Sequence, residues 1–172
     1  MPYFKNLDST FLAIVSAEAS AYHERWVRNG RLGEYGTDVK MRIHVGFPLL
    51  ATQYLKAQRA RAVITESFAR LLRGTVDILA TPTITVGTPL LGQEIVSSPR
   101  GEMPVLSALT LITRPFNLIG FPAISIPCGF VEGRLPAGLQ LAAAPLREAL
   151  LMHAAASFQE VTDFHTKIPP LA

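Results

Sequence analysis

The sequence has few cysteines, few charged residues and no long apolar run. Its 172 residues include one Cys, which excludes an internal disulfide and a cysteine-based zinc site and favours a reducing compartment. Charged residues make up 17% of the chain, below the roughly 25% usual for soluble domains. The hydrophobic fraction of 49% still predicts a folded chain, because apolar burial offsets the entropy lost on folding. We expect so weakly charged a chain to bury surface against something else.

No run of like charges stands out, although the net charge is +3 from 16 basic and 13 acidic residues. The densest basic stretch is Lys56, Arg59 and Arg61, with Glu66 close behind. Because nucleic-acid binding needs clustered positive charge, we expect no nucleic-acid partner. No segment approaches the roughly 18 apolar residues of a membrane span, and the apolar stretch 11–17 is short for a signal peptide. These features predict a cytoplasmic protein without membrane contact.

Common catalytic and metal-binding signatures are also missing. The sequence contains no G-x-S-x-G, no S-x-x-K, no phosphate-binding glycine loop and no G-x-G-x-x-G. The four histidines are too irregularly spaced for a metal pair (His23, His44, His153 and His165). Cys128 ends an apolar run, so it is interpreted as a buried, inert thiol. The residues by themselves therefore predict no metal, no cofactor and no catalytic side chain.

Hydrophobic periodicity predicts an α/β or α+β chain of order ααα-β-α-ββ-α. Apolar residues at three- and four-residue steps, with caps and terminal glycines, predict helices over 8–29, 37–46, 48–73, 105–113 and 147–162. Short apolar runs predict strands over 76–80, 123–128 and 138–142, and the Glu132-Gly133 turn favours a hairpin between the last two. Residues 81–103 are expected to be a long surface loop.

The predicted strands do not make a complete sheet. Three strands that are buried on both faces leave unpaired backbone groups at their edges. We therefore expect the chain to contribute strands to a larger sheet. No internal repeat or linker divides residues 1–172, so they are expected to form a single partial domain.

Several stretches closely resemble the C-terminal part of amidase signature enzymes. They are VDILATPT at 76–83, TRPFNLIGFPAISIPCG at 113–129 and LPAGLQL at 135–141. EALL at 148–151 and TDFH at 162–165 fit the same pattern, and so do Glu18-Ala19, His23 and VKMRI at 39–43 in the first half. The resemblance covers nearly the whole chain in one register. It implies the C-terminal part of the amidase signature fold, a mixed sheet flanked by helices.

The resemblance also implies a chemistry that this chain does not carry by itself. The family hydrolyses carboxamide C–N bonds through an acyl-enzyme, using a nucleophilic Ser, a bridging Ser and a Lys in its N-terminal half. Ser97-Ser98 is followed by Pro99 and lacks the glycine-rich setting, so it is no substitute. We expect a fragment of an amide hydrolase, inactive alone and lacking its N-terminal half or a partner chain. The alternatives are a component of an amidase or glutamyl-tRNA amidotransferase-type complex completed in trans, or a non-catalytic interaction module.

The resemblance further implies four substrate-binding residues. Arg42 aligns with an arginine that grips the substrate carboxylate in the amidase subunits of glutamyl-tRNA amidotransferase, a task that suits a guanidinium; the alternative is a surface arginine. Thr110 stands where those subunits carry an acidic residue for the substrate amine, which argues against glutamine and favours a general amidase. Thr113 and Asn117, with the turn at 81–83, are expected to face the pocket of a small-molecule amide; the alternative is simple loop geometry.

Overall fold

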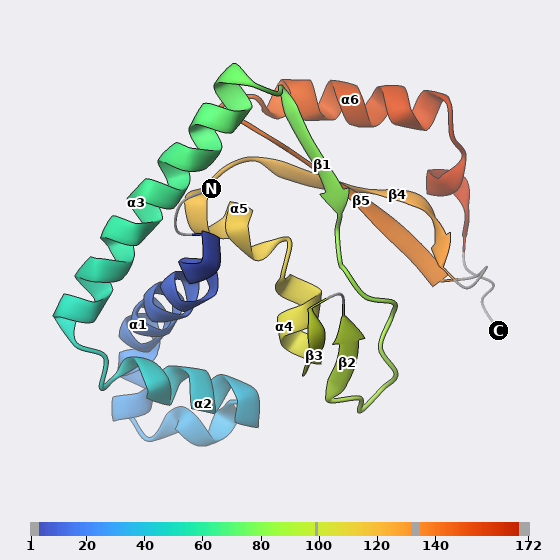
Figure 1. The fold of residues 1–172 in the computed structure, drawn as a ribbon. Helices are drawn as coiled ribbons and strands as arrows, with labels where there is room; N and C mark the ends of the chain where they lie inside the picture. The colour runs from blue at the N-terminus through green and yellow to red at the C-terminus, as the bar shows by residue number, and fades with distance from the viewer. Residues whose placement is uncertain (1–3, 99, 132–134, 169–172) are drawn as a thin grey trace. The chain divides into compact units, whose positions relative to one another are not determined.

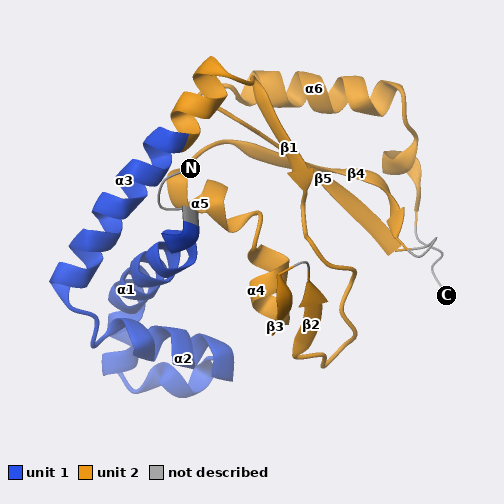
Figure 2. Ribbon diagram, viewed as in Figure 1, with its two compact units in different colours: residues 1–67 blue, residues 68–172 orange. Residues whose placement is uncertain are grey.

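The computed structural model describes residues 4–98, 100–131 and 135–168, and the chain divides into two compact units, residues 1–67 and 68–172 (Figure 2). The helices are α1 (Leu7–Arg28), α2 (Thr37–Gly46), α3 (Ala51–Gly74), α4 (Val105–Thr110), α5 (Arg114–Ile119) and α6 (Glu148–Glu160) (Figure 1). The strands are β1 (Ile78–Pro82), β2 (Ile95–Ser98), β3 (Gly101–Pro104), β4 (Ala123–Val131) and β5 (Leu135–Ala143). The predicted α/β class is confirmed.

In the first unit α1 and α2 pack unusually closely. A Cβ atom at Gly46 would lie 2.0 Å from the backbone oxygen of Ser16, so only glycine fits there. The buried hydroxyl of Ser20 lies 2.6 Å from the carbonyl oxygen of Ile43 and 2.8 Å from that of Ser16, and it shares its proton between them. Small and hydroxyl side chains therefore join the two helices with their polar groups satisfied.

The first turns of the helices differ from the predictions. α1 begins at Leu7, one residue before the predicted start, with Asn6 as its N-cap, and the Ser9 hydroxyl donates to the Asn6 carbonyl oxygen at 3.0 Å. α3 begins at Ala51 rather than at Pro48. The reason is local: the Leu50 backbone N–H donates to the side-chain oxygen of Gln53 at 3.0 Å, half of a capping box that fixes the helix start.

The second unit is built on a three-stranded antiparallel sheet of order β1-β5-β4 (Figure 1). The predicted β4–β5 hairpin is confirmed, with both strands longer than expected; its predicted turn at 132–133 lies outside the described residues. A register shift between Pro127 and Gly129 places a bulge at Cys128. Among the described residues, β1 and β4 pair with β5 only, so both outer edges have no described partner strand. This agrees with the incomplete sheet expected from the sequence.

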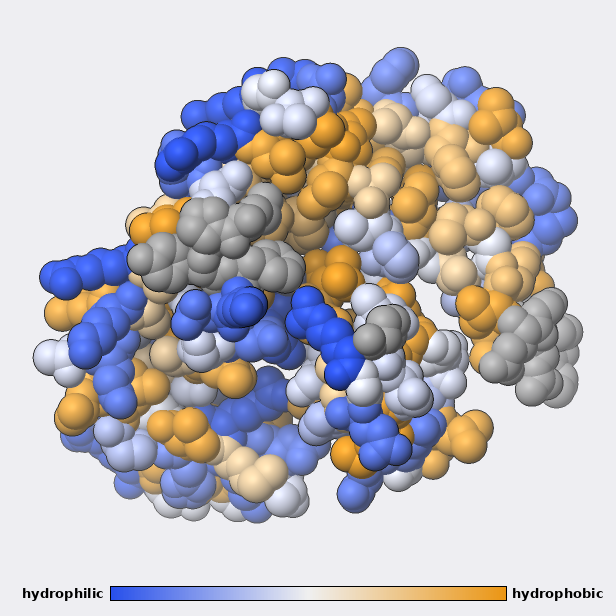
Figure 3. Space-filling view, in the orientation of Figure 1, coloured by the Kyte–Doolittle hydropathy of each residue, from blue (hydrophilic) through white to orange (hydrophobic). Residues whose placement is uncertain are grey.

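One face of the sheet carries the apolar core of this unit. Ile126, Leu141 and Ala143 are buried there against Leu151 and Ala155 of α6. α6 ends at Glu160, two residues before the predicted end of this helix, and Val161 just beyond it is exposed. Apolar surface also remains exposed over β1 and α6, as Figure 3 shows.

Two corrections concern the segment between β1 and β4. The predicted loop at 81–103 contains the β2–β3 hairpin, whose apolar side is marked by the buried Val96. The single helix predicted over 105–113 is instead α4 followed by a separate α5. Pro115 lies in the first turn of α5, where its missing N–H has no partner to lose. Gly120 then ends α5 with a φ of 71°.

Candidate functional site

A row of polar side chains crosses all three strands on the face of the sheet away from α6. Thr81, Gln140 and Ser125 are direct register partners, Thr81 with Gln140 and Gln140 with Ser125. Ile126 next to Ser125 and Leu141 next to Gln140 belong to the apolar core on the opposite face. Strand side chains alternate between faces, so one unbroken sheet presents an apolar side and a polar side.

A pocket of about 260 Å³ lies at this polar face. Thr83, Thr113, Asn117, Ser125 and Gln140 supply its polar lining, and Phe116 and Phe121 are among its apolar residues. None of the residues that line it in the described part of the chain carries a titratable side chain. The pocket can therefore bind a small neutral ligand by hydrogen bonds and apolar contact, but it offers no group for proton transfer.

Two hydroxyl groups in the pocket form a close pair. The Oγ1 atom of Thr83 and the Oγ atom of Ser125 lie 2.5 Å apart. Gly138 makes room for them, because a Cβ atom at this position would lie 2.6 Å from the first hydroxyl oxygen and 2.9 Å from the second. The backbone N–H of Thr83 also donates to the Gly138 carbonyl oxygen at 2.8 Å, which holds the loop after β1 against β5.

Gln140 is held in a single orientation at the bottom of the polar row. The residue is 3% exposed, and its Nε2 atom donates to Thr81 Oγ1 at 3.1 Å and to the Ile112 carbonyl oxygen at 3.2 Å. A carbonyl oxygen can only accept, so the atom facing Ile112 must be the amide nitrogen. Both N–H groups are thereby used, and the side-chain oxygen Oε1 is the acceptor left.

The structure brings two of the four predicted substrate-binding residues together. Thr113 and Asn117 both line the 260 Å³ pocket, and Asn117 Nδ2 donates to the Thr113 carbonyl oxygen at 3.1 Å. Thr110 does not line this pocket. Its hydroxyl donates to the Leu106 carbonyl oxygen at 2.9 Å and accepts from Arg114 at 2.6 Å, so it is engaged within its own helix and the next.

The fourth predicted residue, Arg42, lies in the first unit. It is an exposed residue of α2, one helical turn before the tight contact at Gly46. Its substrate-binding role remains a prediction from the resemblance.

Sequence reasoning missed Ser125 and Gln140 as pocket residues. Both lie within stretches that carried the family resemblance, and polar residues in otherwise apolar strands were the available signal. Only the β4–β5 register places them opposite each other.

A second cavity of the same unit, about 410 Å³, is lined mainly by apolar residues. Leu139, Val86 and Val131 are among them, and Cys128 borders it as a half-buried free thiol. Nearby in the chain, the buried hydroxyl of Thr85 has no hydrogen-bond partner among the described residues. The cavity is larger than the polar pocket, yet it presents few groups that could orient a ligand.

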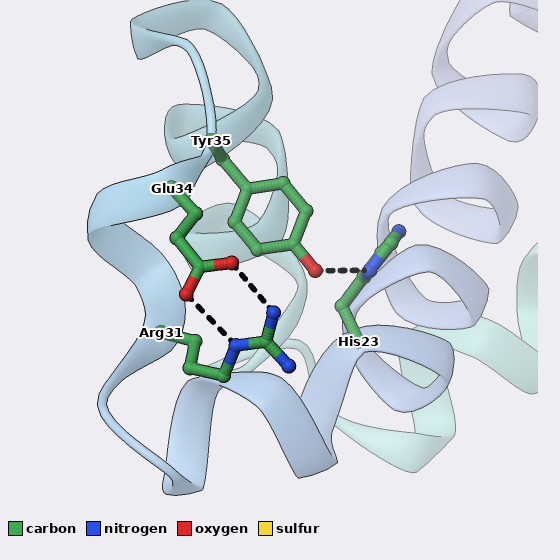
Figure 4. Close-up of polar contacts among 4 residues, drawn as sticks. All are labelled: His23, Arg31, Glu34 and Tyr35. Carbon is green, nitrogen blue, oxygen red and sulfur yellow. Dashed lines mark hydrogen bonds and ion pairs between the residues drawn. The ribbon is translucent and has the colours of Figure 1, made fainter.

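The titratable groups with shifted pKa values lie outside both cavities. In the first unit Arg31 donates two hydrogen bonds of 2.8 Å to Glu34, and these bonds hold the pKa of the Glu34 carboxyl below its usual value (Figure 4). Beside them, His23 Nδ1 and the Tyr35 hydroxyl lie 2.9 Å apart. Near the C-terminal end, a hydrogen bond from Lys167 lowers the pKa of Asp163. The two ion pairs are exposed and organise local turns.

Membrane spans and clustered metal ligands are both absent from the described residues. No helix in that part of the chain is both long and apolar enough to cross a membrane. No three or more His, Cys, Asp or Glu side chains gather there in a way that could hold a metal ion.

Comparison with known proteins identifies the family. The sequence model of the Amidase family matches residues 1–152, so the chain belongs to the amidase family. The chain is 34% identical to the A subunit of glutamyl-tRNA(Gln) amidotransferase from Methanosarcina barkeri, covering 99% of this chain and 39% of that protein. It is 37% identical to the same protein of Chloroflexus aggregans, covering 100% of this chain and 38% of that protein. The part that it matches is a C-terminal portion, about two fifths of these relatives' length.

Solved structures agree with this assignment. A crystal structure of an amidase matches 92% of this chain and 36% of its own, with a TM-score of 0.85 and 26% identity. A protein studied for the evolutionary origins of an s-triazine catabolic enzyme matches 97% of this chain and 36% of its own, with a TM-score of 0.86 and 27% identity. The glutamyl-tRNA(Gln) amidotransferase protein from Thermotoga maritima, again the A subunit, matches 94% of this chain and 33% of its own, with a TM-score of 0.65 and 29% identity.

Proposed function

We propose that residues 1–172 form one partial domain that supplies part of the substrate pocket of an amidase-family hydrolase. The reaction is hydrolysis of a carboxamide C–N bond through an acyl-enzyme, with the nucleophilic Ser, the bridging Ser and the Lys supplied from outside these residues. The observation that carries the proposal is the polar pocket on the second unit, where Thr113 and Asn117 meet Thr83, Ser125 and Gln140. The substrate is a small-molecule amide, and the proposal needs no cofactor, nucleic-acid partner or membrane and places the enzyme in the cytoplasm.

The lining chemistry supports a binding role for this part of the enzyme. Hydroxyl and carboxamide side chains match the donors and acceptors of an amide, and Phe116 and Phe121 offer apolar contact to the rest of a small substrate. General acid–base or nucleophilic catalysis needs a titratable group at the reacting atoms, and this lining has none. The chain therefore orients the amide, and the residues supplied from outside attack it.

A second candidate is an amidotransferase component completed in trans. It is favoured by the relatives named above, which belong to glutamyl-tRNA(Gln) amidotransferase and are 34% and 37% identical to this chain. Thr110 weighs against it, since an acidic residue is expected there for a glutamine amine. Its hydroxyl is also occupied by Leu106 and Arg114.

Co-expression tests the proposal. The chain is produced with an N-terminal half of an amidase-family enzyme that carries the Gly/Ser-rich loop and the Lys, and ammonia release from simple amides and from glutamine is measured. We expect release from simple amides only when both parts are present. A partner half with its nucleophilic Ser replaced by Ala is the control and should release none. A complex that forms without releasing ammonia would identify a non-catalytic interaction module, and release by the purified chain alone would also contradict the proposal.

A further inference from the structure

We propose that the Thr83–Ser125 hydroxyl pair and Gln140 form one recognition element for a carboxamide group, an inference that rests on the proposed function. In it a hydroxyl of the pair donates to the ligand carbonyl oxygen, and Gln140 Oε1 accepts from a ligand N–H. Ser125 and Gln140 are direct partners across β4 and β5, so both groups face the same pocket.

Counting the protons of the Thr83–Ser125 pair identifies a hydrogen-bond donor that is available to a ligand. Two hydroxyls 2.5 Å apart share one hydrogen bond, in which one of them donates and the other accepts. The accepting hydroxyl keeps its own proton, and no other hydrogen bond from either hydroxyl is found among the described residues. Since both residues line the pocket, this proton is available to a ligand acceptor.

The acceptor is the side-chain oxygen of Gln140. The bonds from Nε2 to Thr81 and to the Ile112 carbonyl fix which end of the carboxamide faces the pocket. No donor among the described residues bonds to Oε1, although Gln140 is only 3% exposed. Among the described residues Thr85 Oγ1 is the one buried side-chain oxygen or nitrogen without a partner, so Gln140 Oε1 reaches the solvent of the pocket, where a ligand N–H can take the place of a water.

The pairing selects a carboxamide over related groups. A carboxylate brings a charge and no donor into a pocket whose described lining holds no cation, and an ammonium brings no acceptor. A carboxamide presents one acceptor and one donor on neighbouring atoms, complementary to the hydroxyl and to Oε1. The volume of 260 Å³ limits the ligand to a small molecule, since pockets for drug-sized ligands begin at about 300 Å³.

The test is an NMR titration of the 172-residue chain with propionamide, propionate and N,N-dimethylpropionamide. Propionamide should give saturable shifts at residues 83, 125 and 140. The dimethyl analogue keeps the carbonyl and loses both N–H donors, so we expect it and propionate to bind about 10-fold more weakly, the factor for one lost hydrogen bond at the upper end of its usual range. Equal affinity for propionamide and its dimethyl analogue, or no saturable shifts with propionamide, would overturn the proposal.

Matched serine variants test the donor side. Ser125→Ala should weaken propionamide binding about fivefold, the factor expected for one lost hydrogen bond. Ser97→Ala, at an exposed strand position outside the pocket, should leave binding unchanged. Gln140→Met replaces the carboxamide with an apolar side chain of similar length and should abolish the preference for propionamide over its dimethyl analogue, provided the circular dichroism spectrum is retained. A retained preference in folded Gln140→Met would contradict the acceptor role.

The outcomes separate this inference from the proposed function. Ammonia release by the completed enzyme without amide selectivity in the isolated chain would refute only the recognition element. Amide selectivity in the chain, with no release from the completed complex, would refute only the proposed hydrolase.

Discussion

Two glycines, one in each unit, permit close approaches of different kinds. Gly46 brings α2 against the backbone of α1, where a Cβ atom would lie 2.0 Å from the Ser16 carbonyl oxygen. Gly138 brings β5 against side chains, where a Cβ atom would lie 2.6 Å from the Thr83 hydroxyl. The Ser16 oxygen near Gly46 belongs to the backbone and cannot rotate away, whereas the Thr83 hydroxyl near Gly138 belongs to a side chain that can rotate. One glycine therefore serves packing, and the other preserves the arrangement of a pocket.

The polar groups around the two glycines differ in the same way. At the helix contact the Ser20 hydroxyl is fully used by two carbonyl oxygens. At the pocket, one hydroxyl proton of the Thr83–Ser125 pair and the Oε1 atom of Gln140 are left over among the described residues. The Ser20 hydroxyl therefore serves packing, whereas the polar groups left over at the pocket are open to a ligand.

Gly46→Ala should have the largest effect. In an ordinary helix this change stabilises, but here the new methyl group meets backbone, and we expect a loss of about 3 kcal/mol in the free energy of unfolding. Urea denaturation followed by circular dichroism measures it. Gly74→Ala is the matched control, because nothing lies within 4 Å of its added Cβ atom and it should not destabilise. Equal stability of the two variants would refute the tight α1–α2 contact.

Ser20→Ala sharpens the comparison at the same contact. Removing the hydroxyl takes a hydrogen bond away from two buried carbonyl oxygens, and we expect a loss of about 1.5 kcal/mol. The same denaturation experiment applies. Ser9→Ala, whose exposed hydroxyl bonds to Asn6, is the control and should change stability by less than about 0.5 kcal/mol. A smaller loss for Ser20→Ala than for this control would contradict the assigned role.

Gly138→Ala should affect binding more than stability. The added methyl group must push the hydroxyls of Thr83 and Ser125 apart, which breaks their hydrogen bond at a cost of about 1 kcal/mol. Propionamide titration of the folded variant should show the amide preference reduced. Unfolding as severe as that of Gly46→Ala would mean that the two glycines play the same part.

Glu34→Gln should have the smallest effect, and the effect should depend on pH. The hydrogen bonds from Arg31 hold the pKa of the Glu34 carboxyl below its usual value. A carboxyl with a lowered folded-state pKa stabilises the fold above its unfolded pKa, and this contribution is lost as the pH falls through the folded pKa. The variant should therefore melt slightly below the wild-type chain at about pH 7, with the difference disappearing in acid. A difference in melting temperature that persists in acid would argue against the ion pair.

Helices and strands with strong periodicity were predictable from the sequence, and those defined by a few residues were not. Helices α1, α3 and α6 were found because their apolar residues repeat over many positions, α2 because of its terminal cap and glycine, and the β4–β5 hairpin because two short apolar runs flank a turn. The β2–β3 hairpin was missed because each strand has only four residues. The separate helix α5 was not predicted, because Pro115 is compatible with either end of a helix and the local backbone decides which one.

The candidate site was only partly predictable for a related reason. Thr113 and Asn117 were named because the family resemblance marks their segment. Gln140 was not named, because its place in the pocket depends on the hydrogen bonds that Ile112 and Thr81 accept from it, 28 and 59 residues away along the chain. Contacts at such separations become visible only when the strands are paired.

The polar pocket, rather than the larger apolar cavity, is the place where we expect the amide to bind. Intermolecular nuclear Overhauser effects from bound propionamide test this most directly. We expect contacts from the ligand methyl and methylene protons to the Phe116 ring and the Thr83 methyl group, which line the 260 Å³ pocket. Contacts confined to Val86 and Leu139, which line the 410 Å³ cavity, would contradict it.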